Sequence, residues 1–594
     1  MRPSPAAEAA IAARSDPRTA SSGREPAHAD AAPAPARERW IAGMLLAALI
    51  ALRVLYAYHY EFDSDEPQHL HVVWAWTRGL LPYRDVLDNH APLFHLLMAP
   101  LLSAIGERPE ALHAMRFAMF PLFATVLLAV AMLGRRLWSP RVGLWGAVLA
   151  AAWPQHFLTS LEFRADDLWA ALWLLSLVVL FGGPLSGRRC WAAGLLAGAA
   201  LGVSLKTALL VFGLGLALSA AWPAVRRQRA RAARAAGAWL AGFVLVPAAL
   251  VVLFAGLGTL PALLRATVFG NALLGLWSGP PLRCLWFPLG LPVAFWIARR
   301  LAGEDPRGTS RSVLFLSGAV AYLALVSFWP LVTPQDYLPL EPLAALTIAA
   351  LLVPAGTAAA SASWRWLAAP ALSAAGIVML LAYWPAWSDH TVAQRDLIAD
   401  VLALTRADET VMDLKGESVF RRRPVFWVLE SVTQERFRRG LMRDQITAEL
   451  RAAHTAVAAP DHHRLPPGIR AFLNANYVSV GAVRVLGMRL AAPSNPPAAA
   501  ATPNAPDASP HATASPAVPG AIPFEIELPE RYELLAGATR GRGRLDGAPL
   551  DGPRWLARGP HRYVPAAGES EWTVVWARAV EKGYIPPPRN LESR

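Results

Sequence analysis

Apolar segments, each near the length that crosses a lipid bilayer, follow one another through the first two thirds of this sequence. A bilayer core requires about twenty apolar residues per helix, and every backbone polar group there must be satisfied. About eleven segments meet this requirement and predict a polytopic bundle of membrane helices. They lie near 40–58, 114–134, 141–158, 167–183, 191–205, 207–222, 237–257, 284–299, 312–330, 337–354 and 366–385. Only 17% of the 594 residues are charged, below the quarter typical of a soluble domain.

The loops between these segments differ in charge from one side of the predicted bundle to the other. Arginines gather in one alternating set of short loops, which the positive-inside rule assigns to the cytoplasm. A cytoplasmic N-terminus followed by an odd number of spans then places the long loop at 59–113 and the chain beyond 387 outside. This distribution explains the net charge of +13 as a topology signal, so nucleic-acid binding is not expected.

Composition also divides the chain into regions. Residues 1–37 lack an apolar segment and predict a disordered cytoplasmic tail. The membrane segments fill 38–388. An alternation of helical and strand patterns then predicts an α/β unit at 389–490. A Pro- and Ala-rich linker spans 491–521, and strand patterns predict a β-sandwich at 522–594. Inside the α/β unit the patterns predict helices at 392–405 and 435–450 and strands at 409–414, 425–428 and 477–486.

The first outer loop is unusually rich in ionisable side chains. Asp65 and Glu66 follow the first apolar segment closely, and a carboxylate held at the membrane surface can accept a proton from an attacking hydroxyl. Alternatively, Asp63 or Ser64 caps a helix and Glu66 sits in its first turn, where the helix dipole favours an acid. Glu66 could also orient Asp65 or bind a cation, so both interpretations stay open for this pair.

A second acidic element, Asp88-Asn89-His90, lies later in the same loop. Asp88 could bind acceptor groups or share a metal with the first pair, whereas Asp-Asn and Ala-Pro pairs are also typical of turns. The histidines of this loop lack a HExxH pattern, and Cys190 and Cys284 have no metal-ligand spacing, so no zinc site is expected. No cofactor is required by this chemistry, and a divalent cation is the one candidate.

Basic and aromatic side chains mark three further places at the predicted outer face. Arg164 beside Asp166 could clamp a phosphate bidentately or be solvated among lipid headgroups. Lys206 stands in an apolar setting, where it either snorkels to the surface or binds a phosphate; its cost at mid-membrane predicts two short helices that meet at the outer face. Tyr337 opens a late segment, where an aromatic belt is the simpler interpretation.

Together these motifs resemble the GT-C superfamily of membrane glycosyltransferases. The matching motifs are the DE pair after the first span, DNHAPL in the same loop, GVSLKTALL and YLPLEP. They are most similar to the branch that holds protein O-mannosyltransferases and lipid A aminoarabinose transferases. The resemblance covers about residues 40–390 and implies a helical bundle whose outer loops form an amphipathic platform. Residues 38–388 would then form the glycosyltransferase domain, with 59–113 as its catalytic loop.

The resemblance also implies roles for individual residues. Asp65 would be the general base of an inverting reaction, and Asp88 would match the second acidic residue. The phosphate of a polyprenyl-phosphate-linked donor would be held by Lys206, Arg164 and His90. Relatives often carry a Lys-Pro pair where this chain has Asn-His-Ala-Pro. His90 would therefore replace that cation only when protonated. The side chains left to position the acceptor are Tyr83, Asp166 and Tyr337.

The predicted function is therefore transfer of a pentose or hexose from a polyprenyl-phosphate donor to an acceptor hydroxyl outside the inner membrane. The acceptor would be an envelope glycan, lipid or protein, and membrane lipids are expected partners. A non-catalytic scaffold that binds envelope glycans is the main alternative, since both outer units could simply bind. A transporter would need polar groups near the membrane midplane and inverted repeats, and neither is found in the sequence.

Overall fold

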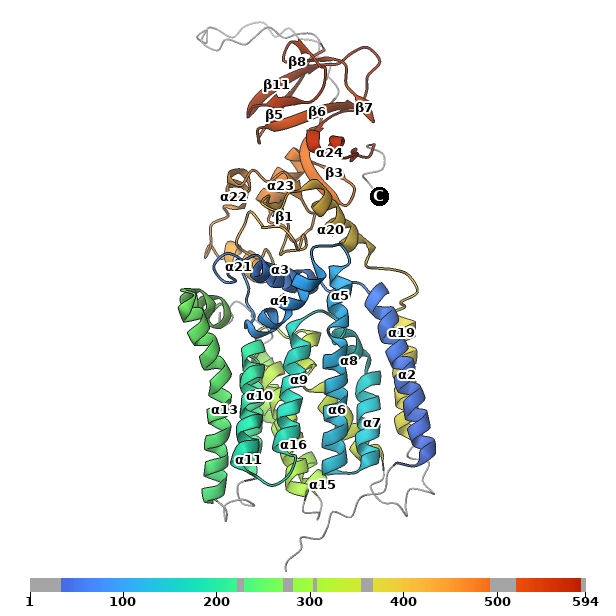
Figure 1. Cartoon of the computed structure of the whole chain (residues 1–594), viewed down its shortest axis with the longest axis vertical. Helices are drawn as coiled ribbons and strands as arrows, with labels where there is room; N and C mark the ends of the chain where they lie inside the picture. The colour runs from blue at the N-terminus through green and yellow to red at the C-terminus, as the bar shows by residue number, and fades with distance from the viewer. Residues whose placement is uncertain are drawn as a thin grey trace, which may run out of the picture.

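A computed structural model describes residues 34–221, 229–270, 281–302, 307–353, 367–491 and 520–588. The protein is built in layers (Figure 1). A layer of upright helices forms one end, and two short helices, α3 (Asp65–Thr77) and α4 (Leu93–Ile105), cross its upper edge. An α/β region lies above these two helices, and a group of β-strands forms the other end.

The upright helices occupy the places that the apolar segments predict. They are α2 (Ala36–His59), α5 (Ala111–Phe117), α6 (Phe120–Leu137), α7 (Pro140–Ala152), α9 (Ala165–Leu180), α10 (Gly187–Val203), α11 (Thr207–Ala220), α13 (Arg229–Gly256), α15 (Trp286–Ala302), α16 (Gly308–Phe328), α17 (Glu341–Leu352) and α19 (Ala368–Tyr383). Within the described residues, four helical stretches are long and apolar enough to cross a membrane: 36–59, 111–137, 229–256 and 308–328. The other upright helices are shorter, so the full number of crossings stays a prediction.

Short helical turns connect the upright helices at their ends. They are α8 (Pro154–Thr159), α14 (Leu260–Leu264), η3 (Arg265–Phe269), η4 (Pro281–Leu285) and η5 (Pro334–Tyr337). The chain also breaks between α10 and α11, where Ser204 has an extended backbone (φ −145°, ψ 126°). The prediction of two short helices on either side of Lys206 is therefore confirmed, and the break lets this lysine leave the apolar layer.

Small residues allow α10 to approach α13 closely. A Cβ atom at Gly194 would collide with the carbonyl oxygen of Trp239, and one at Gly198 would collide with that of Phe243. Close backbone approach through glycine is a common way to join helices in lipid, where van der Waals contact drives association. The contact fixes α10, and with it the turn that carries Lys206.

The α/β region contains α20 (Val392–Leu404), β1 (Val411–Met412), α21 (Ser431–Arg438), α22 (Ile446–Ala452), β2 (Val457–Ala458), α23 (Pro467–Asn476), β3 (Tyr477–Val480) and β4 (Val483–Arg489). The helix predicted at 435–450 was too long: it is interrupted near Gly440, whose φ of +68° does not fit a helix. The strand predicted at 425–428 was wrong. That segment forms bends and no strand, and residues 426–428 line a cavity.

The last part of the chain forms one sheet of its own and extends the sheet of the α/β region. Its elements are β5 (Ile522–Ile526), β6 (Glu530–Ala536), β7 (Thr539–Arg540), β8 (Arg544–Leu545), β9 (Ala548–Pro549), β10 (Arg554–Leu556), β11 (Gly559–Val564), β12 (Trp572–Trp576) and α24 (Ala577–Glu581). One sheet has the order β5-β11-β8-β9. The other has the order β1-β2-β4-β12-β6-β10, with β3 beside β4 and β7 beside β6.

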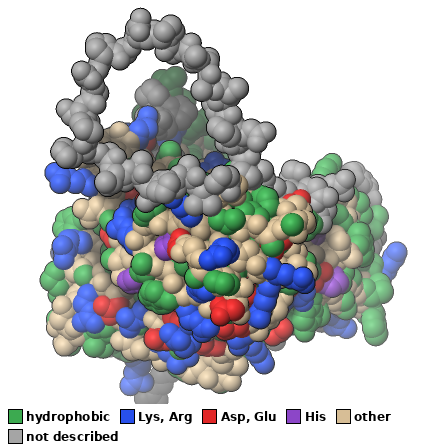
Figure 2. Space-filling model, turned by 90° about the horizontal axis from the view of Figure 1, so that it is seen from above, with side chains coloured by type: hydrophobic (Ala, Val, Ile, Leu, Met, Phe, Trp, Pro, Cys, Tyr) green, Lys and Arg blue, Asp and Glu red, His purple; other side chains and the backbone are tan. Residues whose placement is uncertain are grey.

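This larger sheet changes the predicted division into an α/β unit and a separate β-sandwich. Strand β12 pairs antiparallel with β4, placing Val574 opposite Met488, and one hydrophobic cluster extends from Leu397 to Ala579. The pairing extends the sheet beyond β4 and removes one of its open edges. The two regions therefore share a sheet and a core. Their outer face carries interspersed acidic and basic side chains (Figure 2).

Three polar contacts fasten the α/β region to the crossing helices. The Nδ1 atom of His71 in α3 donates to the carbonyl of Val419 at 2.7 Å. Arg421 lies 3.2 Å from Glu107, which follows α4. The third contact comes from Lys415, whose side chain reaches the start of α3. Helix α3 is consequently buried along most of its length and is held in one orientation between two layers.

Candidate functional site

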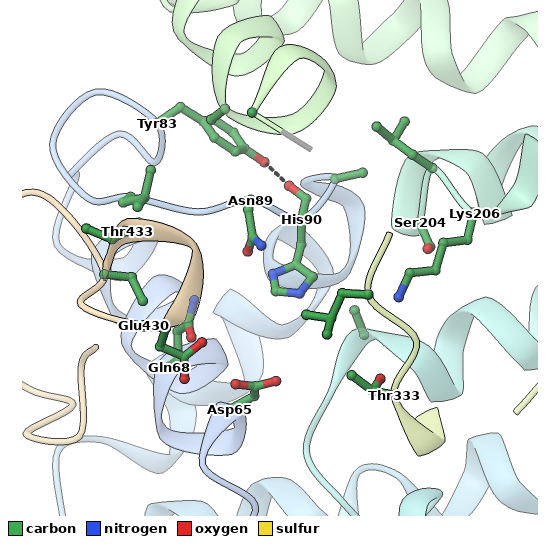
Figure 3. A pocket seen from close by; sticks show the side chains of 18 of the residues that line it. Asp65, Gln68, Tyr83, Asn89, His90, Ser204, Lys206, Thr333, Glu430 and Thr433 are labelled. Carbon is green, nitrogen blue, oxygen red and sulfur yellow. Dashed lines mark hydrogen bonds between the residues drawn. The ribbon is translucent and has the colours of Figure 1, made fainter. Parts of the chain in front are cut away.

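A cavity of about 510 Å³ lies where α3, the α10–α11 turn and the α/β region meet. Figure 3 shows Asp65, His90, Lys206 and Glu430 around it, each from a different segment of the chain. Further lining residues include Gln68, Tyr83, Asn89, Arg164, Asp166, Ser204, Arg265, Trp329, Thr333, Trp427, Thr433 and Arg436. Of the nine site residues predicted from sequence, six line this cavity: Asp65, Tyr83, His90, Arg164, Asp166 and Lys206.

Asp65 stands at the start of α3, with a quarter of its side chain exposed. The backbone N–H of Asp65 donates to Asp63 Oδ1 at 2.9 Å, which fixes the first turn of the helix. One carboxylate oxygen pairs with Arg164 and the other accepts from Lys415 at 2.5 Å. Burial by itself raises the pKa of Asp65, but the charges of Arg164 and Lys415 outweigh it and lower the pKa below its ordinary range.

Lys415 is a site residue that sequence reasoning missed. Its side chain is 1% exposed, and its ammonium group pairs with Glu430 at 2.6 Å as well as with Asp65. It also donates to Ser64 Oγ at 2.9 Å. Burial lowers the pKa of Lys415, but the carboxylates of Asp65 and Glu430 reverse this and raise it above its ordinary value. A lone lysine 350 positions away from Asp65 carries no local signal of this contact.

Glu66 does not line the cavity. Its fully buried carboxylate forms a bidentate pair with Arg116, at 2.8 Å to Nε and 2.5 Å to Nη2. It also accepts from the backbone N–H groups of Asp63 and Phe163, both at 2.9 Å. These contacts join α3 to the helical layer, and they fit the alternative interpretation of Glu66 as a helix-start residue.

Asp88 is fully buried behind His90 and does not line the cavity itself. Its Oδ1 atom accepts from the backbone N–H of His90 at 2.9 Å and from His90 Nδ1 at 3.0 Å. Its Oδ2 atom lies 3.1 Å from His95 Nδ1, and His95 Nε2 lies 2.8 Å from His69 Nδ1. Burial by itself raises the pKa of Asp88, but His95 and His90 lower it below its ordinary range.

Arg164 is surrounded by carboxylates. It contacts Asp65, lies 2.7 Å from Asp63 and 3.3 Å from Asp166, and is 3.8 Å from Glu162. This arrangement fixes Asp65 and leaves Arg164 with little capacity for a further anion. The geometry therefore favours a positioning role over the predicted phosphate clamp.

Lys206 reaches the cavity from the α10–α11 turn and pairs with the fully buried Asp336. Asp336 is itself held by the backbone N–H of Thr333 at 2.9 Å. Two more cations that sequence reasoning missed, Arg265 and Arg436, line the same cavity. Among the described residues neither has a carboxylate within ion-pair distance, and Arg436 lies over the ring of Trp427 at 5.6 Å.

The two predicted tyrosines have different surroundings. Tyr83 lines the cavity and donates its hydroxyl to the carbonyl of His90 at 2.7 Å, with its own backbone at φ +71°. Tyr337 packs on Tyr322, with ring centroids 5.6 Å apart, and is absent from the cavity wall. Across the described ranges, no three His, Cys, Asp or Glu side chains are grouped as metal ligands.

No family model matches this chain, and no curated protein matches its sequence. Solved structures do match its fold. ArnT from Cupriavidus metallidurans in the apo state is 14% identical, with 76% of this chain and 98% of that chain covered and a TM-score of 0.52. The same protein bound to undecaprenyl phosphate matches with equal identity and coverage and a TM-score of 0.50. The chain therefore has the fold of ArnT, in agreement with the GT-C resemblance of its sequence motifs.

Proposed function

We propose that this protein transfers a sugar from a polyprenyl-phosphate-linked donor to an acceptor hydroxyl at the outer face of the cell inner membrane. The observation that carries the proposal is the convergence of Asp65 and Lys206 on one cavity at the edge of the helical layer. The ArnT-like fold supports it, because ArnT has been solved with undecaprenyl phosphate bound. A scaffold would not need these two side chains to converge.

Lys206 is the proposed contact of the donor phosphate. A polyprenyl phosphate is a competent leaving group whose departure needs positive charge more than a proton. Lys206 is partly exposed at a turn between two apolar helices, where a lipid headgroup can reach it while the polyprenyl chain stays in the membrane. Asp336 keeps the ammonium group at this position. Arg265 and Arg436 supply further positive charge on the cavity wall.

Asp65 is the proposed contact of the acceptor. Its ionised carboxylate accepts hydrogen bonds, and an acceptor hydroxyl can provide one. Glu430, Thr433 and Trp427 line the cavity on the side of the α/β region, and an aromatic ring such as Trp427 can pack against a sugar. Asp65 and Lys206 approach the cavity from different elements (Figure 3), so the acceptor and the leaving phosphate can be held by separate groups, which an inverting displacement requires.

Binding of undecaprenyl phosphate tests the donor assignment. The lipid should raise the thermal midpoint of the full-length wild-type protein in nanodiscs, because a ligand that binds only the folded state stabilises it. Lys206→Met should reduce the stabilisation, with apparent affinity weakened about tenfold, as expected when one charged hydrogen bond of about 1.5 kcal/mol is lost. Lys582→Met, at an exposed lysine outside the cavity, is the matched control and should behave like the wild type.

Two results would contradict the assignment. If undecaprenyl phosphate does not stabilise the wild-type protein, a lipid-phosphate donor is excluded. If Lys206→Met and Lys582→Met show the same midpoint shift as the wild type at every lipid concentration, the phosphate lies elsewhere.

A further inference from the structure

His90 and Asp88 form a carboxylate–imidazole pair at the cavity wall. The ring of His90 is 29% exposed, whereas Asp88 behind it is 1% exposed. An ionised carboxylate only accepts hydrogen bonds, so the Nδ1 atom of His90, 3.0 Å from Asp88 Oδ1, must carry a proton. The neutral ring then has its lone pair on Nε2. Asp88 thus fixes the tautomer that makes the other nitrogen of His90 a base.

The neighbours of Asp88 hold it firmly. The backbone N–H of His90 donates to Oδ1, and His95 Nδ1 faces Oδ2. His95 in turn has its Nε2 atom 2.8 Å from Nδ1 of His69, so one buried chain of groups leads from α3 through α4 to the carboxylate. The hydroxyl of Tyr83 holds the carbonyl of His90 at 2.7 Å. The ring of His90 is therefore held through Nδ1, and its backbone is held by Asp88 and Tyr83.

Asp65 is less suited to taking the proton of the acceptor. Arg164 and Lys415 each pair with one of its oxygens, and proton transfer to this carboxylate would remove one of the negative charges that neutralise each cation. In the low dielectric of a partly buried site, that loss opposes protonation. The two cations make Asp65 a stable anion that can hold a hydroxyl, and they make it a weak base.

We propose that His90 is the catalytic base of this protein and that Asp88 is its positioning residue. The inference rests on the proposed function, since it concerns the acceptor of that same reaction. It reassigns the proton transfer that the family resemblance implies for Asp65, and it gives His90 a role other than the predicted phosphate contact. Asp65 keeps the acceptor hydroxyl in place beside the ring of His90.

The step balances as a single displacement. The acceptor oxygen forms a bond to the anomeric carbon with its lone pair, while its proton moves to Nε2 of His90. The bond between the anomeric carbon and the phosphate oxygen breaks, and its electron pair leaves with the polyprenyl phosphate beside Lys206. Asp88 stabilises the resulting imidazolium, as a carboxylate does behind a catalytic histidine. The imidazolium later releases its proton to water.

Charged and titratable groups surround the ring of His90. The groups that face it are Asp88 on its own loop, Asp65 and His69 on α3, His95 on α4 and Arg164 before α9. Protonation of Nε2 removes the base, so turnover should fall on the acid side of the pH profile.

The test compares His90→Gln, His90→Lys and Asp88→Asn in the full-length protein in nanodiscs. Donors are radiolabelled undecaprenyl-phosphate pentoses and hexoses, and an envelope lipid extract provides acceptors.

His90→Gln should lower kcat by about 10²–10⁴-fold with an unchanged donor KM, and its residual turnover should lack the acid limb. His90→Lys should be equally slow, because a lysine supplies a cation and no base at neutral pH. Asp88→Asn should lower kcat with an unchanged donor KM, because the ring of His90 loses the carboxylate that fixes its tautomer. The control is His463→Gln, at an exposed site outside the cavity.

The outcomes separate this inference from the proposed function. Full turnover by His90→Lys would overturn the base role and leave His90 as a simple cation. Wild-type turnover by His90→Gln would overturn the inference while sugar transfer itself stands. If the wild-type protein transfers no sugar from any of these donors although undecaprenyl phosphate stabilises it, the proposed function and the base role both fail. Variants are compared at equal amounts of folded protein, measured by size-exclusion chromatography.

Discussion

Glu66 provides a sharp test of how the site is built, because its neighbour Asp65 has the same chemistry and a different environment. Both partners of the Glu66–Arg116 pair are fully buried. Arg116 also donates to the carbonyls of Tyr60 and Glu61, both at 2.7 Å. Glu66→Gln keeps the shape and removes the only carboxylate on Arg116 among the described residues. Breaking a buried pair by removing one partner costs about 3–5 kcal/mol, because the remaining charge is uncompensated.

The assay follows thermal unfolding of detergent-solubilised protein by size-exclusion chromatography. Glu66→Gln should lower the thermal midpoint by about 2–4 °C in a chain of this length, and Arg116→Met should do the same. The double variant should lose about 2–3 kcal/mol less than the sum of the singles, since residues in one buried pair are coupled. Asp85→Asn is the control, because Asp85 pairs at the surface with exposed Arg84, and it should leave the midpoint unchanged. A stable Glu66→Gln protein without transfer activity would refute this account and return Glu66 to the chemistry.

Two further predictions concern acid stability and the acceptor contact. Burial lowers the pKa of His71 below its ordinary value. The unfolded state therefore binds more protons than the folded state as the pH falls. The contribution of His71 to stability is complete above the ordinary imidazole pKa and is lost as the pH falls toward the lowered pKa of the folded state. The thermal midpoint should therefore fall between pH 7.5 and 5.5, and it should fall less in His71→Gln, whose amide can still donate to Val419; equal slopes in the two proteins would contradict this. Asp65→Asn should lower kcat about 10²–10³-fold, the effect of removing one preorganised group beside the reacting atoms, while undecaprenyl phosphate still stabilises the protein. Near-normal turnover of this variant would exclude Asp65 from the site.

The helices and their ends could be predicted because membrane helices obey local rules. Apolar length located the upright helices, and the cost of a buried charge located the break at Lys206. Contacts between distant segments followed no such rule. The pairing of β4 with β12 joins strands on opposite sides of residues 491–521, and no pattern within either strand specifies its partner. Two patterns that each predicted a small sheet therefore could not show that they build one.

The candidate site divides in the same way. Lys206 could be predicted because it is out of place in its apolar surroundings, and Asp65 because its loop beside the first apolar segment is unusually rich in ionisable side chains. The different surroundings of Asp65 and Glu66 could not, because successive helical residues point about 100° apart and only the fold decides which one faces the core. Lys415 and Arg116 escaped notice because their partners are far away in the sequence. Asp88 was predicted as a direct participant, but its contact with His90 depends on the turn between them.

The most direct test of sugar transfer is mass analysis of envelope glycans from cells with the wild-type protein and from cells with Asp65→Asn. We expect one glycan, lipid or protein species to lose the mass of a single pentose or hexose in the variant, and the corresponding polyprenyl-phosphate sugar to accumulate. Identical envelope glycans and identical donor levels in both strains, with both proteins present at equal amounts, would contradict the proposed function.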